Sequence, residues 1–140
     1  MIDVPETIEP LTEKIIGAGI EVHRTLGPGL LESLYRECLL IELTAAKISF
    51  ERERHIGLTY KGSAIGSRLR LDLLVEGLVV VELKAVESIH PIHLSQVITY
   101  LKLTGCPAGL LLNFNVTSLK AGIRRLVHPD RYVRGPVQRP

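Results

Sequence analysis

The chain of 140 residues contains no tryptophan, and aromatic residues make up only 4% of it. Proteins that hold single-stranded nucleic acid commonly stack the bases on aromatic side chains, so this composition makes RNA a less favoured partner than DNA. No stretch approaches 18 apolar residues, which excludes a membrane-spanning helix. The first residues have neither the basic start nor the apolar run of a secretory signal, so we expect a cytoplasmic protein without membrane contact.

Cysteine is also scarce, with Cys38 and Cys106 alone and far apart. One disulfide is compatible with this count, but the lack of an export signal favours two reduced thiols. His90 and His93 are close in sequence, yet no cysteine or further histidine follows at ligand spacing, which disfavours a zinc site.

What is present is ordinary for a globular protein: 46% hydrophobic and 23% charged residues. The length suits one domain, so we expect residues 1–140 to form a single unit. Helical spacing of apolar residues predicts two N-terminal helices over about 8–46, with a break at Gly27-Pro28-Gly29. Alternating strands and a crossover helix follow over about 48–127, and then an irregular basic tail over 128–140. This order predicts an α/β fold with a mixed β-sheet flanked by helices.

The net charge is only +2, but the charges are unevenly distributed. Residues 1–50 carry eight acids and four bases, whereas residues 119–140 carry six bases and one acid. A basic C-terminal part suits the binding of a polyanion. The alternative is that these charges are simply solvated side chains that cluster without a partner. The residues that we predict to contact nucleic-acid phosphates are Arg68, Arg70, Arg124 and Arg125. Alternatively, tail arginines such as Arg131 and Arg134 dock on the acidic first helix of a second copy, which would give a homodimer.

Three charged residues stand out because they interrupt apolar strands. Asp72 follows Leu71, and Glu82 and Lys84 lie in a strand that is otherwise Leu and Val. Side chains alternate along a strand, so Glu82 and Lys84 point to the same face. Two carboxylates and a lysine at this spacing suit a magnesium site with an activated water, and a salt bridge at a sheet edge is the alternative.

A shared metal requires Asp72 and Glu82 on one face, which constrains the hairpin between them. A two-residue turn would place them on opposite faces. We therefore predict an odd-length loop, Val75-Glu76-Gly77, with Gly77 in the left-handed conformation. This register pairs Asp72 with Val80 and makes Glu82 its diagonal neighbour.

Two further motifs are ambiguous when taken singly. Gln96 and Tyr100 lie four apart in the predicted crossover helix and so share a face, which is more often simply a solvated face. Glu32 lies in the first turn of the second helix, where the helix dipole alone favours an acid.

Taken together, however, six segments resemble the GxxExxY proteins, in the same order. They are Gly29-x-x-Glu32-x-x-Tyr35, Tyr60-Lys61-Gly62, Asp72-Leu73-Leu74-Val75, Val81-Glu82-Leu83-Lys84-Ala85, Gln96-x-x-x-Tyr100-Leu101 and Gly109-Leu110-Leu111-Leu112-Asn113-Phe114. That family is placed in the PD-(D/E)XK nuclease superfamily, and the resemblance covers about residues 8 to 127. Leu71 stands where the superfamily name has proline.

The resemblance implies a restriction-endonuclease-like core and a site of Asp72, Glu82 and Lys84. It also implies that Gln96 and Tyr100 belong to the Gln-x-x-x-Tyr helix of the exonuclease-like branch, with Glu32 as that branch's extra acid. We therefore predict a nuclease that hydrolyses DNA with Mg²⁺, or with Mn²⁺ in its place. Asp72, Glu82 and Glu32 would be its metal-binding residues. The alternative is a non-catalytic nucleic-acid-binding or assembly module that keeps the nuclease fold.

Overall fold

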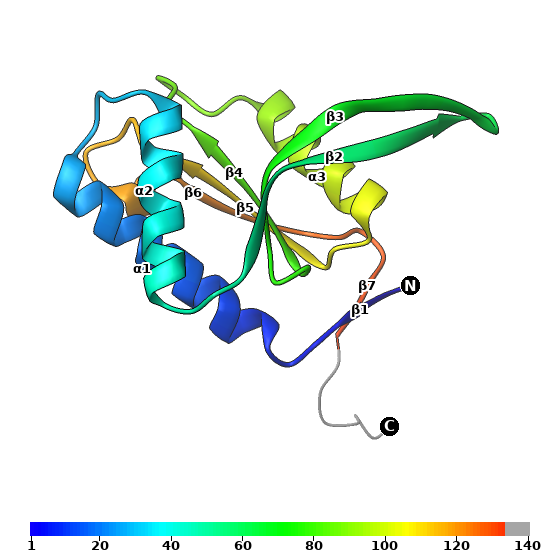
Figure 1. The fold of residues 1–140 in the computed structure, drawn as a ribbon, viewed down its shortest axis with the longest axis horizontal. Coiled ribbons are helices and arrows are strands. Elements are labelled where there is room, and N and C mark those ends of the chain that lie inside the picture. The colour runs from blue at the N-terminus through cyan, green and yellow to red at the C-terminus, as the bar shows by residue number, and fades with distance from the viewer. Residues whose placement is uncertain (134–140) are drawn as a thin grey trace.

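The computed structural model describes residues 1–133, except the side chains of Ser67, Arg68, Tyr132 and Val133. Its centre is a five-stranded sheet in the order β2-β3-β4-β5-β6 (Figure 1). The strands are β2 (Phe50–Tyr60), β3 (Ser63–Val75), β4 (Val79–Lys84), β5 (Ala108–Asn113) and β6 (Ile123–Val127). The helices are α1 (Ile8–Leu26), α2 (Glu32–Ala45) and α3 (Pro91–Thr104), with a short 3-10 helix at Leu119–Gly122.

The sheet is mixed because α3 crosses over between β4 and β5. These two strands are parallel, and each other neighbouring pair in this sheet is antiparallel. All six residues of β5 are buried, as expected for a central strand covered on both faces. The predicted α/β architecture, a mixed sheet flanked by helices, is confirmed.

Helices cover both faces of the sheet. Helices α1 and α2 pack on one face, against β-strand residues such as Leu73, Val81 and Leu83. Helix α3 packs on the other face, against Leu74 and Val80. Successive residues of β4 therefore face opposite layers, and Glu82 and Lys84 belong to the α3 face. In the described part of the chain, no helix is long and apolar enough to cross a membrane.

The ends of the chain differ from the prediction. The segment before α1 contains a short strand, β1 (Ile2–Val4), which pairs in parallel with β7 (Arg131–Val133). The tail from residue 128 is thus not irregular throughout, because backbone hydrogen bonds to β1 hold its first part. Arg134 lies outside the described residues.

The β3–β4 hairpin has an odd-length loop as predicted, but its register is displaced. Leu73 pairs with Val81 and Val75 pairs with Val79, so the loop is Glu76-Gly77-Leu78 rather than Val75-Glu76-Gly77. Both Glu76 (φ 54°) and Gly77 (φ 65°) are left-handed, and this double bend moves the loop one residue along. The predicted pairing of Asp72 with Val80 is therefore wrong. The observed register continues to Asp72 beside Glu82.

The turn that leads into β6 depends on a glycine at residue 122. A Cβ atom there would lie 2.1 Å from the backbone oxygen of Asn113. We expect Gly122→Ala to destabilise the fold by about 3 kcal/mol or more, because backbone must move. Gly17→Ala is the matched control, since a Cβ at this helical position meets no atom within 4 Å. It should raise the melting temperature slightly. Equal melting temperatures for the two variants would contradict the observed packing.

Candidate active site

The site is built around Asp72 and Glu82, which lie side by side on neighbouring strands. The backbone N–H of Asp72 donates to Oε1 of Glu82 (3.1 Å), and the backbone N–H of Leu83 donates to Oδ2 of Asp72 (3.1 Å). Each carboxylate is thus oriented by the backbone of the other residue's strand. The condition that both acids share a face is met.

Burial of Glu82 beside Asp72 has an electrostatic cost. Glu82 is only 5% exposed. Burial, and secondly the charge of Asp72, raise the pKa of Glu82 to about 8. Both causes disfavour the charged form of Glu82, and a bound cation would offset them.

Helix α2 brings Glu32 and Arg36 to the same place. Burial and then the charge of Asp72 raise the pKa of Glu32, and the charges of Lys84 and Arg36 oppose this rise. Arg36 Nη1 lies 3.5 Å from Oδ1 of Asp72. Its Nε is buried and makes no hydrogen bond with the described residues. The sequence analysis missed Arg36; the available signal was its position one helical turn after Glu32, on the same face.

The loop before α2 explains the Gly-x-x-Glu-x-x-Tyr spacing. Gly27 (φ 71°) and Gly29 (φ 99°) adopt backbone conformations that favour glycine. The buried Tyr35 hydroxyl donates to the oxygen of Gly27 (2.6 Å) and accepts from the N–H of Leu30 (3.1 Å). Its ring stacks on Phe114 at 4.5 Å between centroids. Tyr35 therefore anchors the loop that sets the start of the helix and the position of Glu32.

We expect Tyr35→Phe to lower the free energy of unfolding by about 1–3 kcal/mol, because a buried donor and acceptor lose their partner. Urea denaturation measures this change directly. Tyr60→Phe is the control, since Tyr60 is 61% exposed and should show no loss. A loss of equal size in both variants would show that the hydroxyl of Tyr35 has no anchoring role.

Lys84 and helix α3 complete the site on the face of Glu82. The charge of Lys84 lowers the pKa of both Glu82 and Glu32, so its ammonium acts on both acids. Burial raises the pKa of Tyr100, and the charges of Glu82 and Asp72 raise it further. A hydrogen bond from Gln96 lowers the same pKa. The structure thus places Gln96 and Tyr100 together on the helix face that meets the carboxylates.

His93 is a second residue that sequence reasoning did not assign to this site. Desolvation, and then the charge of Lys84, lower the pKa of His93, which places its ring near that lysine. The Nδ1 atom of His93 accepts from the backbone N–H of His90 (3.1 Å) and caps the start of α3. The available signal was its spacing of three residues before Gln96, which puts both on one side of the helix.

The exit from β4 is held by Asn113, which is 2% exposed. Its Oδ1 accepts from the N–H of Val86 (3.0 Å), and its Nδ2 donates to the oxygen of the same residue (3.0 Å). The neighbouring Phe114 N–H donates to the carbonyl of Lys84 (2.9 Å). These bonds fix the backbone that carries Lys84.

The predicted phosphate-binding arginines lie in two separate places. Arg70 is exposed on β3, two residues before Asp72, and the side chain of Arg68 lies outside the described residues. Arg124 and Arg125 are neighbours on the edge strand β6, so they point to opposite faces of the sheet. Arg125 pairs with Glu13 of α1 at 2.8 Å. In the register, Arg124 pairs with Leu111, and Leu111 pairs with Glu82, so Arg124 shares the face of the site.

The carboxylate pair fits a hard divalent cation by its chemistry. Asp72 and Glu82 supply oxygen ligands, and the side chain of Asp72 is 21% exposed, which leaves a route from solvent. Among the described residues, no group of three or more His, Cys, Asp or Glu side chains lies close enough to hold a metal ion. The arrangement is thus a pair of acids with Glu32 near it, and the role of Glu32 as a ligand stays a prediction.

Comparison with known proteins agrees with this geometry. A family model described as PD-(D/E)XK nuclease superfamily matches residues 9–126. The searches of curated proteins and of solved structures returned no significant match. The match covers the helix of Glu32, the strands of Asp72 and Glu82, and the helix of Gln96 and Tyr100. It does not distinguish the narrower GxxExxY group. The chain belongs to the PD-(D/E)XK nuclease superfamily.

Proposed function

We propose that the protein is a nuclease that hydrolyses phosphodiester bonds in DNA with Mg²⁺, or Mn²⁺ in its place. The observation that carries this proposal is the adjacent pair of Asp72, which is partly exposed, and Glu82, which is buried, with Lys84 on the same face. Two repelling carboxylates in a low-dielectric environment are costly unless a cation binds them. Membership of a nuclease superfamily supports the same chemistry.

In this proposal, Asp72 and Glu82 hold the metal, and Glu32 binds it or a water in its shell. The metal would lower the pKa of a water and neutralise charge on the phosphate. Lys84 orients the attacking water and stabilises negative charge that develops at the phosphorus. The Gln96 amide and the Tyr100 hydroxyl position the strand that is cut.

The charge and composition of the chain support DNA as the substrate. Arg124 is exposed on the face of Glu82, and Arg70 lies close to Asp72 in sequence. Contacts from arginine to phosphate give affinity without reading the base sequence. The absence of tryptophan leaves few platforms on which single-stranded bases could stack.

The test is cleavage of end-labelled duplex DNA by wild type and by Asp72→Asn, with Mg²⁺, with Mn²⁺ and with a chelator. We expect wild type to cut only with metal, and Asp72→Asn to lose activity while its fold remains, because asparagine is nearly isosteric. Asp130→Asn is the matched control at an exposed aspartate. Duplex binding without cleavage under every metal condition would overturn the proposed activity and favour a non-catalytic binding module.

A further inference from the structure

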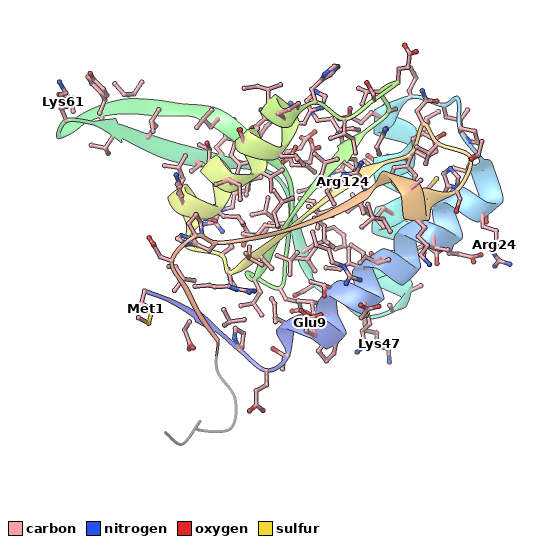
Figure 2. All side chains as sticks on the ribbon, turned by 180° about the vertical axis from the view of Figure 1, so that it is seen from behind. Met1, Glu9, Arg24, Lys47, Lys61 and Arg124 are labelled. Carbon is pink, nitrogen blue, oxygen red and sulfur yellow. The ribbon has the colours of Figure 1, made fainter. Side chains whose placement is uncertain are left out.

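The most prominent feature outside the site is a two-stranded arm, residues 54–70, formed by the outer parts of β2 and β3. Strand β3 pairs with β4 only at Leu73–Val75, but it pairs with β2 back to Ser63. The arm therefore leaves the sheet where Asp72 lies. Figure 1 shows it extending past α3, and Figure 2 shows Lys61 at its tip.

The outer arm contributes little to the core. At its root, Ile56 packs with Leu71 and the α3 residue Leu101. Beyond the root, every described side chain of residues 57–66 is exposed except the partly buried Leu58. An isolated hairpin is only marginally stable in water, so such a long extension needs a reason other than packing.

The charge of the arm has one sign. Residues 54–70 contain Arg54, Lys61, Arg68 and Arg70 and no aspartate or glutamate. Arg54, at the root, pairs with Glu51 at 3.5 Å, so the positive charge of the outer arm comes from the other three bases. At the tip, the Lys61 ammonium lies 5.4 Å from the centroid of the Tyr60 ring. A basic ribbon free of acids is complementary to a polyanion and repels a second copy of itself.

We propose that this arm lies in the major groove of duplex DNA and holds the duplex against the carboxylate site. The inference rests on the proposed function. The major groove of B-DNA is about 12 Å wide and admits a two-stranded ribbon. Nine residues of β3, from Ser63 to Leu71, span roughly 30 Å, which is close to one turn of the duplex. The arm starts beside Asp72, so a duplex bound along the arm passes close to the carboxylates of Asp72 and Glu82.

This mode of binding also selects the class of duplex. The major groove of A-form RNA is deep and too narrow for side chains to enter, so the arm suits B-form DNA and disfavours double-stranded RNA. Pairing of arms between two copies is opposed by their like charge. It is also opposed by the irregular register near Leu58, since such bulges protect a strand edge from edge-to-edge pairing.

Two variants test the arm. In the first, an Asn-Gly turn replaces residues 57–68 and joins Ile56 to Leu69, which are paired in the register. This variant keeps the residues that pack on α3. In the second, Lys61→Gln is combined with Arg70→Gln, in case the shortened arm fails to fold. The matched control combines Lys14→Gln with Lys47→Gln; Lys47 (φ 59°), like Lys61 (φ 47°), has a left-handed backbone.

Binding is measured by fluorescence anisotropy in a chelator, against DNA and RNA duplexes of about two turns, over a range of salt. We expect the shortened arm to lower DNA affinity by at least about 10-fold. If both side chains contact phosphates, the second variant flattens the log-affinity against log-salt slope by about 1.8, roughly 0.9 per contact. The control should match wild type, and wild type should bind the RNA duplex more weakly than DNA.

Unchanged DNA affinity and slope in both arm variants would overturn the inference. The inference would also be overturned if the arm contributed equally to the affinities for the DNA duplex and the RNA duplex. A third contrary result is that the arm variants keep their DNA affinity but sediment as a smaller species than wild type, which would make the arm a contact between two copies. Cleavage with Mg²⁺ is scored separately on the same DNA. DNA binding that depends on the arm, without cleavage, would support the role of the arm and refute the nuclease activity. Cleavage with DNA binding that does not depend on the arm would support the nuclease activity and refute the role of the arm.

Discussion

Lys84→Ala should slow DNA cleavage by roughly 10²- to 10⁴-fold, because it removes the positive charge that orients the attacking water and stabilises the transition state. Lys84 lies at the end of β4 on the face of Glu82, and its charge acts on Glu82, Glu32 and His93. Single-turnover cleavage at saturating enzyme isolates the rate of this step from binding.

Lys84→Arg should not restore the rate, since guanidinium is wider than ammonium and stays protonated. Lys102→Ala, at an exposed position of α3, is the control and should cut at the wild-type rate. DNA binding in a chelator should survive both changes at Lys84. If Lys84→Ala cuts as fast as wild type, the lysine is merely a structural partner of the two acids.

Glu82→Gln should stabilise the metal-free protein at pH 8. The pKa of Glu82 is raised to about 8 in the fold, above the ordinary value near 4.5. The folded state therefore holds this proton more tightly than the unfolded state. The contribution of Glu82 to the free energy of unfolding is therefore full below about pH 4.5 and is lost as the pH rises through about 8. Glutamine stays neutral and avoids the loss. At about 1.4 kcal/mol per pKa unit, the rise from 4.5 to about 8 corresponds to a gain on the order of 4 kcal/mol at pH 8.

Urea denaturation in a chelator at pH 5 and pH 8 measures this difference. The gap between Glu82→Gln and wild type should widen with pH, and Glu6→Gln, at an exposed position, should follow wild type at both. A constant gap would mean that the Glu82 carboxyl titrates normally, and that burial beside Asp72 costs nothing.

Much of the fold follows from local patterns in the sequence. Apolar spacing predicts α1, α2 and α3, and the fully apolar run of β5 predicts a central strand. The strand β7 could not be predicted, because a segment of three residues with prolines nearby is too short to show a periodic pattern. Its partner is β1, at the other end of the chain. The length of the arm could not be predicted either. Alternation of apolar and polar residues predicts a strand, but it does not show how far the neighbouring strand of the sheet extends alongside it.

The site divides in the same way. Charges within apolar strands single out Asp72, Glu82 and Lys84, since burial of a charge is expensive. Their exact pairing depended on the left-handed Glu76, a conformation that is uncommon for a residue with a side chain. Arg36 was missed because an arginine on a half-exposed helix is ordinary in sequence, and only the packing of α2 on the sheet brings it to Asp72.

Binding of the metal by the two acids is the central claim, and isothermal titration of Mg²⁺ or Mn²⁺ into wild type, Asp72→Asn and Asp130→Asn tests it most directly. The carboxylates adjoin one another through backbone hydrogen bonds of 3.1 Å each, so they can bind one ion together. Wild type and Asp130→Asn should bind the ion with the same affinity, and Asp72→Asn should bind it at least about 10-fold more weakly. Equal affinity of Asp72→Asn and wild type would contradict the account, because the ion would then be held somewhere other than the Asp72–Glu82 pair.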